Sequence, residues 1–214
     1  MIHHISLKYG AFWFMDKNLF SNEAIFQKCQ SHIQEELKRT KEEFILEHYK
    51  KYSDPDMPPV WKTLEVITFG TLSKLYCNLK DNSIKKKIAK EFYLPQHIIL
   101  ENWIKCAVVL RNYLAHHARL WNRNFPIIPQ TSKPFRKKWL NHQIPVTNKL
   151  YPHLCSLQYF LNSIKEDNFF KERLKVLIAN HPNVDIAAMG FPADWEKEPL
   201  WEGRANGLVL LSPL

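Results

Sequence analysis

The sequence predicts an all-α protein, and three observations lead to that expectation. Apolar residues recur at helical spacing along most of the 214 residues. Clusters of prolines separate the helical segments. Signals of β-strands are nearly absent, apart from a short apolar stretch at Leu208 to Leu211. A chain of this length suits one or at most two domains. We expect one helical domain of residues 1–180, with an irregular segment of residues 181–214 packing on it.

The N-terminal part is expected to contain two long helices. Residues 19 to 52 are predicted to form one helix, because apolar positions follow helical spacing and Ser21 or Asn22 can cap its start. Three prolines within residues 54–59 end that helix. The next helix is predicted from about Val60 to Leu79. Its apolar residues lie almost all round the helix, so we expect it to be buried in the core.

Four further helices are expected along the rest of the chain. The first covers about residues 83–92, and the second begins at Pro95, where a missing N–H costs nothing, and runs to roughly Arg119. Prolines at 126, 129 and 134 mark a loop. The last two helices fit residues 147–164 and 168–180. The tail from His181 is expected to be irregular, with residues 194–201 folding back as an apolar clip.

The composition narrows the class of protein. Lys and Arg exceed Asp and Glu by nine, which fits either a polyanionic partner or an ordinary basic surface. Five glycines, with neither a GxGxxG nor a GxxxxGK[ST] motif, argue against a Rossmann fold and a P-loop. The four cysteines are widely spaced in apolar helical contexts, which predicts buried free thiols in a reducing cytosol: Cys29, Cys77, Cys106 and Cys155. No membrane span or signal peptide is expected, so we predict a cytoplasmic protein.

The stretch LRNYLAHHARLWNRN, residues 110–124, contains the residues best suited to chemistry. On a helix, Arg111 and His116 are separated by about 140° in azimuth and about 7.5 Å along the axis. Their side chains can therefore converge on one group beside the helix, such as a phosphate. Asn112 lies four residues before His116 and shares its face.

These residue types suit cleavage of RNA by its own 2′-hydroxyl. That reaction needs a proton removed from the 2′-hydroxyl, a proton delivered to the 5′-oxygen, and positive charge near the phosphorane. Histidine titrates near neutral pH and can serve either proton role. Arginine stays charged and offers a planar fork to phosphate oxygens. The sequence offers no convincing cluster of acidic ligands beside His116, so neither a metal nor another cofactor is expected.

The same stretch resembles a family motif. Arg111 followed by His116 fits the Arg-x4–6-His motif of HEPN domains, and the longer string RNYLAHHARLWNR is similar to the motif of the Abi-like (abortive infection) family, a bacterial HEPN branch. Further segments resemble that family at residues 39–52, 58–79 and 189–201, so that the likeness covers roughly residues 13 to 201. Family members usually extend further at the N-terminus, which leads us to expect an N-terminally shortened chain.

The resemblance implies a fold and an activity. HEPN domains are small helical bundles that usually pair, and their Arg/His sets meet at the dimer interface as one composite, metal-independent ribonuclease site. Members are associated with abortive phage infection and toxin-like RNA cleavage. Carried over by motif position, Arg111 and His116 are the catalytic pair and Asn112 is a polar helper. His117 could replace His116. The implied partners are RNA, a second copy, and an antitoxin or phage-derived trigger.

Several charged residues beyond the motif also have expected roles. Arg119 and Arg123 are candidates for contacts with phosphates. Glu65 is predicted to be buried and to pair with Arg111. The basic clusters at residues 85–87 and 136–138 fit guidance of RNA and plain surface charge equally well. The alternative to a nuclease is a non-catalytic HEPN module that binds RNA or a protein, or an inactive fragment.

Overall fold

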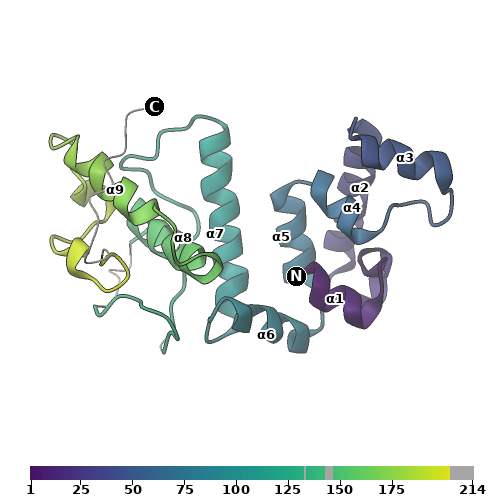
Figure 1. Cartoon of the computed structure of the whole chain (residues 1–214), viewed down its shortest axis with the longest axis horizontal. Coiled ribbons are helices and arrows are strands. Elements are labelled where there is room, and N and C mark those ends of the chain that lie inside the picture. The colour runs from purple at the N-terminus through teal and green to yellow at the C-terminus, as the bar shows by residue number, and fades with distance from the viewer. Residues whose placement is uncertain (133, 143–146, 203–214) are drawn as a thin grey trace.

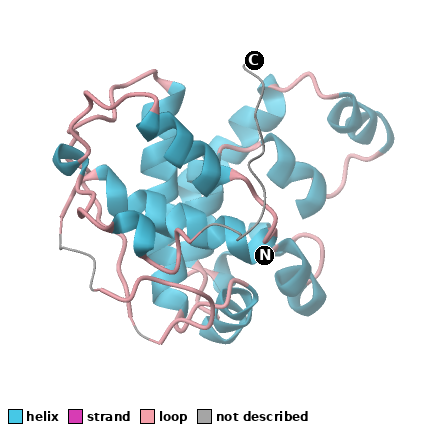
Figure 2. Cartoon of the chain, turned by 60° about the vertical axis from the view of Figure 1, so that its left-hand side comes forward, coloured by secondary structure: helices cyan, strands magenta, loops and turns pink. Residues whose placement is uncertain are grey.

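The computed structural model describes residues 1–132, 134–142 and 147–202. Within these residues the chain is a set of helices joined by loops and contains no strand (Figure 2). The N-terminal helices lie on one side, the long helix α7 stands in the middle, and α8 and α9 lie on the other side (Figure 1). The predicted all-α fold is therefore confirmed. The apolar stretch Leu208 to Leu211 lies outside the described residues.

The N-terminal part differs from the prediction in two ways. A short helix, α1 (Ile2–Tyr9), precedes the segments that were expected, and its Ile5 is fully buried. The single helix predicted over residues 19–52 is wrong, because the chain forms α2 (Glu23–Arg39) and α3 (Glu43–Lys51). Asn22 caps α2 by accepting a hydrogen bond from the Ile25 N–H at 2.9 Å, as one of the two expected caps. Thr40 is extended and ends α2.

The second long helix is also divided. Residues 60–79 form α4 (Val60–Val66) and α5 (Phe69–Asn78), and Thr68 caps α5 through a hydrogen bond from the Thr71 N–H to its Oγ1. The break turns α4 toward solvent on one side. Trp61 is 51% exposed, so the expectation of a helix buried all round is wrong for α4. Helix α5 packs against both α2 and α7.

Helix α7 is the central element of the fold. It spans His97–Ala115, follows α6 (Asn82–Glu91), and packs against α5, α6 and α8 (Leu150–Ile164). Two details of the predicted helix are wrong. Pro95 stands before the N-cap residue Gln96 and outside the helix, and the helix ends at Ala115 and not near Arg119. The early end matters, because it places the two histidines of the motif at and beyond the last helical turn.

The C-terminal part packs on α8. Helix α9 covers Phe170–Ala179, close to its predicted range. The segment after it folds back, and its Trp195, Leu200 and Trp201 are buried, as the predicted apolar clip requires. The Glu198 carboxylate holds the clip by accepting hydrogen bonds from the Asn141 N–H at 2.6 Å and from the imidazole of His142 at 2.5 Å.

The burial of the cysteines largely follows the expectation, and a cluster of aromatic rings completes the core. All four cysteines are free thiols, and Cys29, Cys106 and Cys155 are buried, while Cys77 is half-buried. Trp103 stacks on Phe135 and Trp139 between α7 and α8. Among the described residues, no helix has the length and apolar character needed to cross a membrane.

Candidate functional site

The C-terminal end of α7 carries the candidate site, and its backbone has a defined shape. The His117 N–H donates to the Leu114 carbonyl at 3.0 Å, and the Ala118 N–H donates to the Tyr113 carbonyl at 2.9 Å. This pair of hydrogen bonds is the Schellman arrangement, which needs a left-handed residue at the first position beyond the cap. His117 occupies that position with a φ of +50°. The histidine pair therefore forms the turn that ends the helix.

The two histidines have different roles in this turn. His116 is the C-cap residue, with its backbone N–H bonded to the Asn112 carbonyl at 3.1 Å. Glycine is the usual residue at the left-handed position, and a side chain there stores backbone strain. His117 thus supports the turn through its backbone. Both imidazoles are exposed, and within the described part of the chain neither forms an ion pair or a side-chain hydrogen bond.

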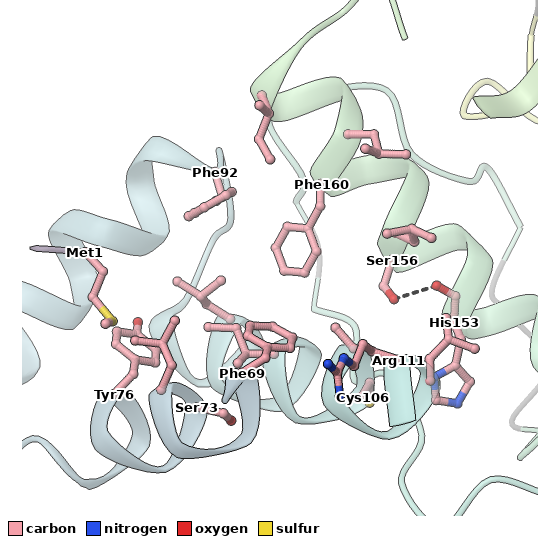
Figure 3. Close-up of a pocket in the computed structure, with 18 of the residues that line it drawn as sticks. Met1, Phe69, Ser73, Tyr76, Phe92, Cys106, Arg111, His153, Ser156 and Phe160 are labelled. Atoms are coloured by element: carbon pink, nitrogen blue, oxygen red, sulfur yellow. Dashed lines mark hydrogen bonds between the residues drawn. The ribbon is translucent and has the colours of Figure 1, made fainter. Parts of the chain in front are cut away.

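Arg111 also reaches the surface, but on another side of the helix. Its guanidinium stands among the side chains that line an apolar cavity between α5, α7 and α8 (Figure 3). Within the described residues it makes no salt bridge, and its hydrogen bond to Asn112 Oδ1 is long, at 3.4 Å. A bond of that length is weak. Arg111 is therefore a cation with its hydrogen-bonding capacity largely unused inside the monomer.

Some of the supporting residues are exposed to solvent, and others contact protein groups in the turn after α7. Asn112 is exposed and contacts Arg111, and Arg119 is exposed with its guanidinium 5.9 Å from the Trp121 ring centroid. Arg123 is half-buried: its guanidinium lies 4.3 Å from the Tyr113 ring centroid, and its Nε donates to the Arg119 carbonyl at 2.7 Å. Arg123 therefore holds the turn after α7 as well as adding charge to it.

Both expectations about Glu65, its burial and its ion pair with Arg111, are wrong. Glu65 is exposed on α4, near Arg39, and does not pair with Arg111. The break between α4 and α5 causes this difference, since it removes residue 65 from the face that packs on α7. The absence of this pair leaves Arg111 without a carboxylate in the described part of the chain.

Several lysines of the basic clusters at residues 85–87 and 136–138 form ion pairs with carboxylates of the protein. Lys85 is buried, and its ammonium lies 3.1 Å from the Glu101 carboxylate and donates to the Cys77 carbonyl at 2.9 Å. Lys137 and Lys138 are engaged with carboxylates, at 2.7 Å and 3.1 Å. Lys85 cannot guide RNA, whereas Lys86, Lys87 and Arg136 are exposed.

The cavity beside Arg111 was not foreseen from the sequence. Its volume is about 550 Å³, and apolar side chains form almost all of its wall. Burial raises the pKa of the Cys106 thiol to about 12 and lowers the pKa of His153 to about 4, so both groups are neutral near pH 7. The only sequence signal was the apolar run on α7, which equally fits a filled core.

The described residues do not bring together three or more His, Cys, Asp or Glu side chains that could hold a metal ion. The titratable side chains exposed at the end of α7 are the imidazoles of His116 and His117 and the guanidinium of Arg111. Such groups can bind phosphate oxygens and transfer protons.

The fold and this helix end define a class of protein: an all-α chain with exposed imidazole and guanidinium groups where its central helix stops. The comparison with known families adds the family. Residues 1–122 match the family described as Abi-like protein, which is more than half of the chain, and the chain belongs to that family. The match includes Arg111 to Asn122 of the motif, while the resemblance at residues 189–201 lies outside it. No curated protein and no solved structure matches the chain.

Proposed function

We propose that this Abi-like protein is a metal-independent endoribonuclease of the abortive-infection type. One observation carries the proposal: Arg111 and His116 are both exposed at the end of α7, and neither is neutralised by a carboxylate in the described residues. A structural Arg or His is usually paired with a protein group. The net charge of +9 adds to this argument, since it favours RNA as the partner.

The reaction assigns one role to each side chain. His116 accepts the proton of the RNA 2′-hydroxyl, and the 2′-oxygen attacks the adjacent phosphorus. The bond from phosphorus to the 5′-oxygen breaks, and the leaving oxygen takes a proton from an imidazolium. Arg111 binds the phosphoryl oxygens while negative charge develops on them. The products are a 2′,3′-cyclic phosphate and a 5′-hydroxyl.

A second copy of the chain supplies the second proton-transfer group. One imidazole cannot be base and acid at once, and Arg111 and His116 of one chain lie on different sides of α7. In a two-fold pair, the histidine of one copy removes the 2′-proton and that of its partner protonates the 5′-oxygen. Asn112, His117, Arg119 and Arg123 would position the substrate and its neighbouring phosphates. An antitoxin or a phage-derived trigger would regulate the pair.

The test is cleavage of mixed RNA in EDTA by the purified protein. We expect cutting by the unaltered chain, and a loss of about 100-fold or more in the His116→Ala and Arg111→Gln variants. His32→Ala and Arg173→Gln change exposed residues far along the sequence and serve as matched controls. Equal cutting by the unaltered chain and His116→Ala would refute the assignment. Cutting by His116→Ala but not His117→Ala would transfer the role to His117.

The alternative is a non-catalytic module that binds RNA or a protein through the same residues. The observation that favours it is that Arg111 lines the cavity beside α7, whereas His116 does not. A gel shift without cleavage, at concentrations where the protein is dimeric, would support this function.

A further inference from the structure

The cavity beside α7 has the size and shape of a ligand site. Its volume of about 550 Å³ falls within the range of small-molecule sites in proteins. Helices α5, α7 and α8 form its walls, with Phe92 and Met1 at one end and His153 at the other (Figure 3). No segment of the described chain fills it.

The cavity is elongated because one stripe of α7 forms its length. The stripe has helical spacing and consists of Leu100, Ile104, Ala107, Arg111 and Leu114. From Leu100 to Arg111 it rises about 16 Å along the helix axis. Leu100, Tyr76 and Ile88 are buried toward one end, whereas Leu114 is 55% exposed at the other end, beyond Arg111. An extended apolar chain fits this shape better than a compact ring.

Arg111 is the charged side chain among the described residues that line the cavity, and the N-terminal residue Met1 lies at the opposite end (Figure 3). The other titratable side chains of the wall do not compete with Arg111. Burial keeps the His153 imidazole neutral near pH 7 and the Cys106 and Tyr76 side chains protonated. Ser156 Oγ is already committed, because it donates to the His153 carbonyl at 2.9 Å. The site therefore combines a long apolar wall with a single unpaired guanidinium.

We propose that this cavity binds a single-chain fatty acid, with the carboxylate on Arg111 and the alkyl chain along α7 toward Tyr76 and Leu100. The planar guanidinium can hold a carboxylate by two parallel hydrogen bonds. One guanidinium balances one negative charge, which favours a monoanionic carboxylate over a dianionic phosphate monoester. Burial of the alkyl chain contributes free energy in proportion to the apolar area removed from water.

A second copy of the chain is a poorer occupant of the same cavity. The lining is a hollow and not a flat face, so the surface of an identical copy would leave much of it unfilled. Self-association through this wall is therefore an outcome that the test must distinguish from fatty-acid binding.

The binding test uses the whole chain without RNA. Nile red, an uncharged apolar dye, is bound in the cavity and displaced by decanoate, decanol or butanoate. We expect decanoate to bind about tenfold more tightly than decanol, because only decanoate gains the charge-assisted pair. Butanoate should displace little dye, because it buries too little apolar surface. Equal affinities for decanoate and decanol would overturn the proposal.

Two variants locate the site. Arg111→Gln should abolish the preference for decanoate while leaving decanol unchanged, and Arg173→Gln, at an exposed arginine outside the cavity, should keep it. Ala107→Phe should weaken both ligands at least about tenfold, since the ring fills the space beside α7. Should Ala107→Phe fail to fold, as judged by circular dichroism, the chain-length and head-group series on the unaltered protein decides. Dye that is released by dimerisation, with decanoate inactive, would identify a second copy as the occupant.

The site also has a consequence that rests on the proposed ribonuclease function. A carboxylate on Arg111 competes with the RNA phosphate, so decanoate should slow cleavage and decanol should not. Tight binding of decanoate without slower cleavage would refute the competition. Absence of RNA cleavage without any ligand would refute the proposed function and would leave the binding result intact.

Discussion

The buried His153 makes the stability of this fold sensitive to acid. Its side chain lies on α8 with 2% of its surface exposed, and its ring stacks on Phe125 with centroids 4.2 Å apart. Burial lowers the pKa of His153 from 6.5 to about 4, and the backbone of Ile127 opposes part of that change. Below pH 6.5 the unfolded chain binds a proton that the folded chain excludes.

The sign and size of the effect follow from this difference in pKa. The unfolded state binds more protons between about pH 6.5 and pH 4, so the free energy of unfolding falls as the pH falls through that range. At about 1.4 kcal/mol for each pKa unit, the full effect is about 3 kcal/mol. Between about pH 7 and pH 4.5, most of it, about 2 kcal/mol, should be lost. His48, whose pKa is lowered by burial and then by Lys62, adds a loss of the same sign.

The assay is urea unfolding followed by circular dichroism at about pH 7 and about pH 4.5. Other groups titrate in this range, so the measurement is the difference between the unaltered chain and His153→Phe, which keeps the stacking on Phe125 and removes the titration. We expect the unaltered chain to lose about 2 kcal/mol more than the variant. Equal losses in the two proteins would show that His153 is protonated without cost, and that its surroundings are not as dry as the packing indicates.

Three further substitutions test the packing around α7. His117→Gly should raise the free energy of unfolding by about 0.5 kcal/mol, because glycine takes the left-handed conformation without strain; a lower urea midpoint would contradict the assigned turn. Lys85→Ala should cost about 3 kcal/mol in the same assay, because the Glu101 carboxylate loses its partner, whereas Lys86→Ala should change stability by less than about 0.5 kcal/mol. Gly70→Ala should stabilise α5 by about 0.5 kcal/mol, because an added Cβ would meet its nearest neighbours at 3.7 Å and 3.9 Å; destabilisation would reveal a tighter crossing.

The helix breaks show where local patterns were insufficient. Thr40 and Thr68 each interrupt a run of helical spacing, and Thr68 caps the helix that follows it. Threonine is a common cap, so the signal was present. The apolar periodicity alone does not reveal such a break, because two helices in series can keep the same apolar spacing as one helix. The break between α4 and α5 was not predicted, and a continuous helix would have placed Glu65 in the core close to Arg111.

The sequence by itself determined the all-α class, the apolar clip at the C-terminus and the stretch that places Arg111 and His116 near one helix end, because helical period and turn residues are local properties of a chain. Only the tertiary structure decided that α7 stops at Ala115, that Arg111 has no carboxylate partner among the described residues, and that a cavity opens beside it. Those features depend on how α5, α7 and α8 pack, and packing joins residues that no local pattern connects.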